Sequence, residues 1–295
     1  MVILQSPLTR LALAAVAAAG GLFASMALAA SPELALPAKV EGGFIFRFAE
    51  LPGGGAGRPA RLAVMPEGQP TMILGRRLIG LKDGDKRAPF VWDPPGKNPL
   101  DGNAWMADGT FLAVSGSRLG MPEENGFGVL IELPEENMRI APAGPDLFYL
   151  FGGTTDEQRQ SIYLYAKGGQ LLRLVQLDLP VAAVTGNGVL TFFATGNAIY
   201  RLMPREGVGL IHETDDEVTS LALAGTGGLF YGTPSGAGYV RGPGEGVAFL
   251  RGAPAEVAAQ GEDLFVVIPE MGVLKIAPVS PFDSIAPYSQ TPTGR

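Results

Sequence analysis

A cluster of bulky apolar residues that follows a Gly or Asp turn recurs at a nearly constant interval along this chain. Successive clusters are centred on Phe111, Phe148, Leu190, Phe230 and Phe265, which lie 37, 42, 40 and 35 residues apart. Self-similarity at a period near 40 residues is typical of repeat architectures, in which each unit stacks on its neighbours to bury its apolar faces. The spacing therefore predicts a series of similar small units, packed through these aromatic and aliphatic side chains.

Each repeat divides into four short strands. In the fifth repeat the apolar runs 218–224, 229–232, 238–241 and 247–251 are separated by the Gly, Pro, Ser and Thr residues that turns require. After the first thirty residues, no Gly-free and Pro-free stretch of a dozen residues carries a helical apolar stripe. These features predict an all-β fold, a β-propeller of six four-stranded blades. A pair of β-sandwiches is the alternative.

The sixth repeat lacks a convincing fourth strand, because the chain is interrupted at Pro278 and Pro281. Upstream of the first repeat, the unassigned run Phe44–Phe48 alternates in hydrophobicity like a strand. We therefore expect this N-terminal strand to complete the sixth blade, since closure of the ring removes two open sheet edges. In the second repeat, the outer strand is predicted at 138–140.

The two ends of the chain differ in composition from the repeats. Residues 1–30 carry one charge, Arg10, and then an apolar run that ends in small residues before Ser31. This pattern predicts a cleaved secretory signal peptide, with an uncleaved membrane anchor as the alternative. We expect the propeller domain to occupy residues 31–280, followed by a Pro-rich tail at 281–295. Abundant Ala, Gly and Pro beside such a leader indicate a bacterial protein of the periplasm.

Charge and cysteine content restrict the partners and the chemistry. Without the leader the chain carries 21 basic and 29 acidic residues, a net charge of −8, which disfavours nucleic acid as a partner. The absence of Cys excludes disulfides, a thiol nucleophile and a lipoprotein anchor. We expect a monomer without a membrane span after signal cleavage, whose partner is an envelope protein or a small ligand.

The repeats at roughly 42–278 resemble the β-propeller superfamily in a generic way. The segment Phe151-Gly152-Gly153 before Ile162–Tyr165 is similar to a kelch blade, and Trp92-Asp93 is similar to the WD dipeptide, but each occurs once. Neither resemblance identifies a propeller family.

A second resemblance concerns one part of the chain. Asn98–Asn103 followed by Ala107–Phe111 resembles a segment of the gluconolactonase and senescence-marker family. That resemblance implies a central divalent cation, held by one Glu, two Asn and one Asp, which polarises a lactone carbonyl. The Gly-Glu-Gly-Pro opening of that family is missing here. A metal-dependent lactonase-like hydrolase is therefore the alternative function, and no resident cofactor is predicted otherwise.

The single histidine, His212, restricts catalysis, since many hydrolases use an imidazole as a general base. No Gly-x-Ser-x-Gly nucleophile motif accompanies it. His212 is interpreted as a loop residue beside an acidic turn. A cation site formed with Glu213, Asp215 and Asp216 is the alternative, since their oxygens suit calcium.

In a four-stranded blade, the connections to the next blade and those between the second and third strands emerge on one face. The long connections Leu51–Ala60, Asp93–Asn103, Ser115–Gly126 and Gly152–Ser161 all fall there, which predicts an interaction surface on that face. The main functional prediction is a noncatalytic periplasmic propeller that binds a protein or ligand through these loops. The candidate binding residues are Trp92, Asp93, Asn98, Asp101, Asn103, Arg118, Glu123, Glu124, Asn125 and Arg159.

Overall fold

A computed structural model gives the fold of the repeats. The structure describes residues 38–40, 43–49, 61–74, 77–80, 90–92, 100–123, 126–153, 160–203, 207–225, 227–260, 263–268 and 272–278. The predicted leader at 1–30 and the predicted tail at 281–295 lie outside these residues.

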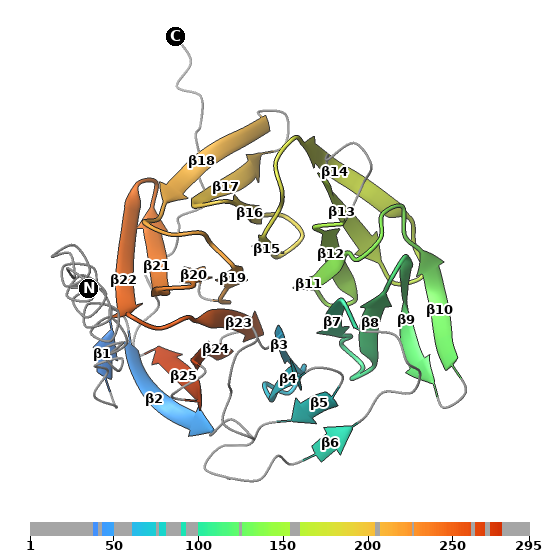
Figure 1. Ribbon diagram of the computed structural model, residues 1–295, viewed down its shortest axis with the longest axis horizontal. Helices are drawn as coiled ribbons and strands as arrows, with labels where there is room; N and C mark the ends of the chain where they lie inside the picture. Colours follow the sequence, from blue (N-terminus) through green and yellow to red (C-terminus); the bar gives the residue numbers. More distant parts are fainter. Residues whose placement is uncertain are drawn as a thin grey trace, which may run out of the picture. The chain divides into compact units, whose positions relative to one another are not determined.

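The described residues form six antiparallel sheets arranged as blades around an axis, a six-bladed β-propeller (Figure 1). Five blades have four strands in sequence order from the axis outward. Blade 1 consists of β3 (Arg61–Val64), β4 (Pro70–Leu74), β5 (Arg77–Gly80) and β6 (Phe90–Trp92). Blade 2 consists of β7 (Gly102–Trp105), β8 (Phe111–Ser115), β9 (Arg118–Glu123) and β10 (Gly126–Glu132).

The next three blades repeat this order. Blade 3 consists of β11 (Arg139–Gly144), β12 (Leu147–Phe151), β13 (Gln160–Ala166) and β14 (Leu171–Leu177). Blade 4 consists of β15 (Ala183–Gly186), β16 (Thr191–Thr195), β17 (Ala198–Met203) and β18 (Gly207–Glu213). Blade 5 consists of β19 (Ser220–Leu223), β20 (Leu229–Thr233), β21 (Gly236–Gly242) and β22 (Glu245–Arg251).

The sixth blade joins both ends of the propeller. Its strands β23 (Glu256–Gln260), β24 (Asp263–Ile268) and β25 (Gly272–Pro278) come from the C-terminal side, and β2 (Gly43–Ala49) pairs antiparallel with β25. The predicted closure by an N-terminal strand is therefore confirmed. A short strand that the sequence did not predict, β1 (Ala38–Val40), adds to the outer edge of β2 and makes this blade five-stranded.

Two details of the second repeat were predicted wrongly. The segment Ser115–Gly126 is not a long loop, because it contains the whole of β9 after a tight turn at Gly116, whose φ is +61°. The predicted outer strand at 138–140 instead leads into β11, the inner strand of blade 3. Both errors arise because β9 contains Gly120 and Pro122, which a propensity-based assignment reads as loop residues.

The recurring aromatic cluster packs the blades together, as predicted. Phe148, Phe230 and Phe265 are fully buried in their second strands. In blade 4, however, the fully buried residue is Phe192, whereas Leu190 lies just before β16 and is only partly buried. Neighbouring blades cover both faces of each sheet, so consecutive residues such as Phe192 and Phe193 are both buried.

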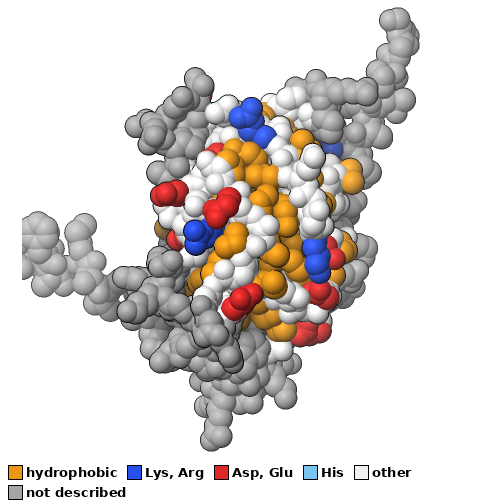
Figure 2. Space-filling view, turned by 90° about the vertical axis from the view of Figure 1, so that its right-hand side faces the viewer, with side chains coloured by type: hydrophobic (Ala, Val, Ile, Leu, Met, Phe, Trp, Pro, Cys, Tyr) orange, Lys and Arg blue, Asp and Glu red, His pale blue; other side chains and the backbone are white. Residues whose placement is uncertain are grey.

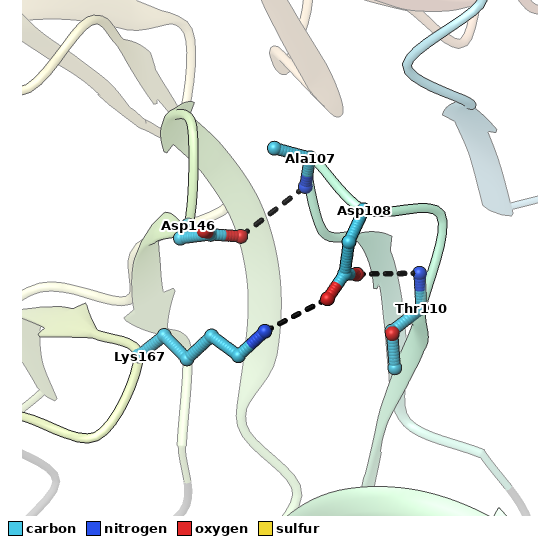
Figure 3. A network of polar contacts seen from close by, with 5 residues as sticks. All are labelled: Ala107, Asp108, Thr110, Asp146 and Lys167. Atoms are coloured by element: carbon cyan, nitrogen blue, oxygen red, sulfur yellow. Dashed lines mark hydrogen bonds and ion pairs between the residues drawn. The ribbon is translucent and has the colours of Figure 1, made fainter.

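A polar network joins blades 2 and 3 at the ends of their strands (Figure 3). Lys167 Nζ lies 2.8 Å from Asp108 Oδ2, the amide of Thr110 donates to Asp108 Oδ1, and the amide of Ala107 donates to Asp146 Oδ1. The hydrogen bond from Lys167 is the main reason that the pKa of Asp108 lies well below its usual value. Since these side chains are exposed, solvent screening keeps their contribution to stability small.

The outer strands expose apolar side chains. Figure 2 shows the side that carries β10 and β14, where hydrophobic side chains form bands among charged ones. Val129, Leu130 and Leu172 are exposed on these two strands. Next to them Arg118 Nε lies 3.3 Å from Glu132 Oε1, and such charges discourage edge-to-edge pairing with another chain. Within the described part of the chain, no helix has the length and apolar character needed to cross a membrane.

Candidate functional site in the central channel

The inner strands enclose a cavity on the propeller axis. Residues from β3, β7, β11, β15, β19 and β23 all line it, and its volume is about 80 Å³. All six inner strands begin at the same face of the propeller, which we call the mouth face. The starts of β3 and β23 lie close together at this face, because the amide of Leu62 donates a hydrogen bond of 2.8 Å to Glu256 Oε1.

Asn103 is the polar group that distinguishes this cavity. It is the second residue of β7, is 6% exposed, and lines the cavity near the mouth face. Its neighbour Gly102 allows β11 to approach, because a Cβ at Gly102 would come within 2.8 Å of the backbone nitrogen of Ile140. No acceptor in the described part of the structure bonds to Asn103 Nδ2. A buried amide donor without a partner is rare in folded proteins and suggests that a ligand group pairs with it.

Other polar side chains of the inner strands already have partners. Thr185 Oγ1 accepts a hydrogen bond from the amide of Leu223, and Ser220 Oγ accepts one from the amide of Val257. The donor–acceptor distance is 3.0 Å in both bonds. Each of these bonds satisfies the edge of the next inner strand around the ring. Asn103 differs from them because it lines the cavity and its Nδ2 has no hydrogen-bond partner among the described residues.

The described lining of the cavity does not fit a divalent cation. Calcium requires about six to eight oxygen ligands. Among the described residues, only Asn103 and Thr185 contribute side-chain oxygens to the lining, and the Thr185 hydroxyl is already hydrogen bonded. Among the residues that the structure describes, no group of three or more His, Asp or Glu side chains is arranged so that it could hold a metal ion.

The structure brings few of the predicted binding residues together. Asp93, Asn98, Glu124, Asn125 and Arg159 lie outside the described residues, as do loop residues 51–60. Trp92 ends β6 at the mouth face, but only its backbone is described. Among the candidates whose side chains the structure describes, Asn103 alone lines the central cavity.

Arg118 and Glu123 cannot act on one face, because they begin and end the same strand, β9. Arg118 lies at the mouth face and pairs with Glu132, whereas Glu123 lies at the opposite face with its carboxylate over Gly128. Asp101 has a structural role, since its Oδ2 accepts a hydrogen bond from the amide of Gly116 and stabilises the β8–β9 turn. The predicted binding surface is therefore divided between the two faces.

Two other candidate positions also differ from their predicted roles. Asp108, which belongs to the gluconolactonase-like segment, lies in the network of Figure 3 at the opposite face, away from Asn103. His212 does not join a cation site. Its ring lies 5.9 Å from the Tyr231 ring, centroid to centroid, and burial lowers its pKa. Gly246 leaves room for the imidazole, because a Cβ there would overlap it.

Sequence reasoning missed a buried carboxyl group, Glu135, in the connection between β10 and β11. Glu135 is 5% exposed, and the Tyr163 hydroxyl donates a hydrogen bond of 3.1 Å to its Oε1. Burial raises the pKa of Glu135, and hydrogen bonds from Tyr163 and Ser161 oppose the rise. Gly153 packs against this side chain, since a Cβ at Gly153 would lie 2.5 Å from Glu135 Oε2. In the sequence, Glu135 stands in a polar run that is typical of an exposed loop.

The raised pKa of Glu135 predicts a pH-dependent stability. Because the folded state favours the protonated carboxyl, its stabilising effect is complete below the unfolded-state pKa near 4.5 and is lost as the pH rises through the folded-state pKa. We expect Glu135→Gln to unfold at a higher urea concentration than the wild type at pH 7.5, with the advantage shrinking at pH 4.5. The exposed neighbour Glu136→Gln is the control. An equal difference at both pH values would contradict this assignment.

Comparison with known proteins finds solved structures of similar fold at low sequence identity. No protein family and no curated protein matches the sequence of this chain. A gluconolactonase from Xanthomonas campestris has a TM-score of 0.58 at 11% identity, covering 84% of this chain and 94% of its own. Virginiamycin B lyase from Staphylococcus aureus has a TM-score of 0.52 at 16% identity, covering 73% and 79%. Regucalcin from Agrobacterium tumefaciens, described as a calcium-binding protein, has a TM-score of 0.54 at 15% identity, covering 74% and 88%.

These comparisons contradict the main functional prediction. The noncatalytic interaction module is wrong, because the similar structures include a gluconolactonase and a lyase, and they favour the alternative, the lactonase-like enzyme. The physical reason is that the prediction rested on the absence of catalytic sequence motifs. Such motifs do not record side chains that separate strands bring to one cavity, as six strands do around Asn103.

Proposed function

We propose that this protein is an enzyme that opens cyclic esters, that is lactones, by hydrolysis at the central cavity. The observation that carries the proposal is the buried Asn103 amide, which lines a cavity on the propeller axis and has no partner for its Nδ2 among the described residues. The propellers of similar fold that are named gluconolactonase support the same class of substrate.

The cavity suits a carbonyl group rather than a whole substrate. Its volume of about 80 Å³ compares with roughly 30 Å³ per water molecule, so it admits a small group. In this arrangement the lactone ring occupies the mouth face and its carbonyl oxygen accepts a hydrogen bond from Asn103 Nδ2. The surrounding wall is mostly apolar, with β3, β19 and β23 contributing only Leu, Val and Ala side chains to it.

Asn103 then acts on the charge that develops during the reaction. Water adds to the carbonyl carbon, and the carbonyl oxygen becomes negative while it faces the amide donor. A preorganised donor in apolar surroundings stabilises such an oxyanion more strongly than water does. When the ester bond breaks, the ring oxygen takes up a proton and a hydroxy acid leaves. The reaction is proposed without a resident cation, because the described lining does not supply its ligands.

The test is hydrolysis of a panel of aliphatic and sugar γ- and δ-lactones by the purified protein, with and without EDTA. We expect turnover that survives EDTA, and we expect Asn103→Asp to lower kcat/KM by roughly a hundredfold, because the variant keeps the size of the side chain but loses the donor. A matched control is Asn187→Asp. Asn187 is an exposed turn residue whose Oδ1 accepts a hydrogen bond from the amide of Leu190, and a carboxylate oxygen at this position can accept the same bond. Absence of turnover with every lactone, full activity in Asn103→Asp, or loss of activity with EDTA would each contradict the proposal.

The place of action is also a proposal. The apolar leader predicted at residues 1–30 supports export to the periplasm. N-terminal sequencing of the exported chain tests it, since a start at Met1 would contradict cleavage.

A further inference from the structure

A second pocket lies between blades 4 and 5 at the mouth face. Its volume is about 200 Å³, and it shares no residue with the central cavity. Three segments line it: the β18–β19 connection, the β20–β21 turn, and the end of β22 with the residues that follow. The pocket is therefore separate from the proposed lactone site.

The walls of this pocket are held in place by hydrogen bonds. The amide of Thr214 donates to the carbonyl of Asn197, and Asn197 Nδ2 donates to the carbonyl of Thr214, so the β18–β19 connection is tied to the neighbouring hairpin. On the other side, the amide of Ser235 donates to Thr233 Oγ1, and Thr233 is buried. The pocket thus has a preformed frame that leaves its charged side chains available.

Three charged residues line this pocket, Asp215, Asp216 and Arg251. Asp216 Oδ1 accepts a hydrogen bond from the amide of Glu217, whereas no ion pair joins Asp215 or Arg251 to another described side chain. Burial is the main reason that the pKa of the Tyr231 phenol is raised; the Asp215 carboxylate adds to the rise and the Arg251 guanidinium opposes it. The hydroxyl therefore stays protonated at neutral pH and remains a donor.

The remaining wall is apolar. Ala237, Ala248 and Leu250 line the pocket beside the charged groups, and Tyr231 is only 6% exposed. A volume of 200 Å³ is below the usual range of about 300–1,000 Å³ for drug-sized ligands. These dimensions suit a molecule the size of a free amino acid.

We propose that this pocket binds a small zwitterion, an α-amino acid with a short apolar side chain. The carboxylate pairs with Arg251 and accepts a hydrogen bond from the Tyr231 hydroxyl, the ammonium group pairs with Asp215, and the side chain contacts Leu250. Arg is suited to this role because its planar donors match a carboxylate. A neutral sugar of similar size leaves both charges without counterparts, so it binds less well.

The test measures binding directly, by calorimetry and by chemical-shift changes, with the chain that starts at Ser31. The probes are L-leucine, L-leucinamide, 4-methylpentanoate and glucose. We expect L-leucine to bind at least tenfold more tightly than each of the other three, because the amide lacks the carboxylate and the acid lacks the ammonium group. Equal binding of leucinamide and leucine, preferential binding of glucose, or no binding of leucine at about 10 mM, which is ten times a Kd of 1 mM, would each overturn the proposal.

Variants locate the site. Arg251→Gln and Asp215→Asn are each expected to weaken leucine binding at least tenfold, and Tyr231→Phe to weaken it less. Arg173→Gln, an exposed arginine on β14, is the matched control and should bind as the wild type does. Unchanged binding in Arg251→Gln would overturn the assignment. Arg251→Gln should leave lactone hydrolysis unchanged, so failure at this pocket and failure of the proposed activity are distinguishable.

Discussion

A chain that begins at residue 50 is expected to lose cooperative folding, because it lacks β2. Six register pairs join β2 to β25 and close the ring. In an antiparallel ladder every second pair exchanges two backbone hydrogen bonds, so six pairs correspond to about six bonds. At about 1 kcal/mol for each bond, their loss removes about 6 kcal/mol. That loss is comparable with the whole unfolding free energy of a typical domain, about 5–15 kcal/mol. Urea unfolding followed by circular dichroism and fluorescence measures the effect.

Two longer chains are the controls for this truncation. A chain that begins at Ser31 keeps β1 and β2, and a chain that begins at Gly43 lacks β1 but keeps β2. Both should unfold cooperatively, with the second slightly less stable because β1 pairs only with the outer edge of β2. If the chain from residue 50 unfolded at the same urea concentration as the chain from Ser31, closure by β2 would not contribute to stability.

Phe230→Ala is expected to lower the unfolding free energy by about 3–5 kcal/mol. Phe230 is fully buried, and its ring centroid lies 5.9 Å from that of Tyr239 and 6.4 Å from that of Phe249. Removal of the ring leaves a cavity between blades 5 and 6, because Phe230 packs in one buried cluster with Leu264 and Val266 of blade 6. Urea denaturation at pH 7 measures the change.

The control for this core substitution is Val189→Ala. Val189 is 79% exposed in the turn before β16, so its truncation should change stability by less than about 0.5 kcal/mol. A loss below about 1 kcal/mol in Phe230→Ala would mean that the neighbouring rings collapse into the space, and the recurring aromatic residue would then not be a principal packing group.

The fold followed from the sequence where local signals and periodicity agreed. In blade 5, Gly and Pro turns separate the strands so clearly that Leu229–Thr233 and Glu245–Arg251 lie close to their predicted bounds. In blade 2, by contrast, Gly120 and Pro122 concealed β9, because pairing with β8 and β10 outweighs the weak strand preference of these residues. The unpredicted β1 is a three-residue strand, too short for a periodic signal.

The candidate site was much less predictable. Asn103 was named from a short resemblance, but nothing local distinguishes it from Asn98 or Asn125, which occur in similar polar surroundings. The pocket between blades 4 and 5 was not predicted, although Asp215 had been considered as a cation ligand. Arg251, its counterpart, follows 36 residues later, and sequence alone does not indicate that two such residues face one pocket.

The repeat, the strand content and the closure by an N-terminal strand could all be read from the chain, because hydrophobic periodicity and turn chemistry are local properties. Which polar side chains meet at one site depends instead on how distant strands pack. The ring places residues from six distant strands around one axis. Asn103 Nδ2 has no hydrogen-bond partner there because none of the described residues of the other strands offers it an acceptor.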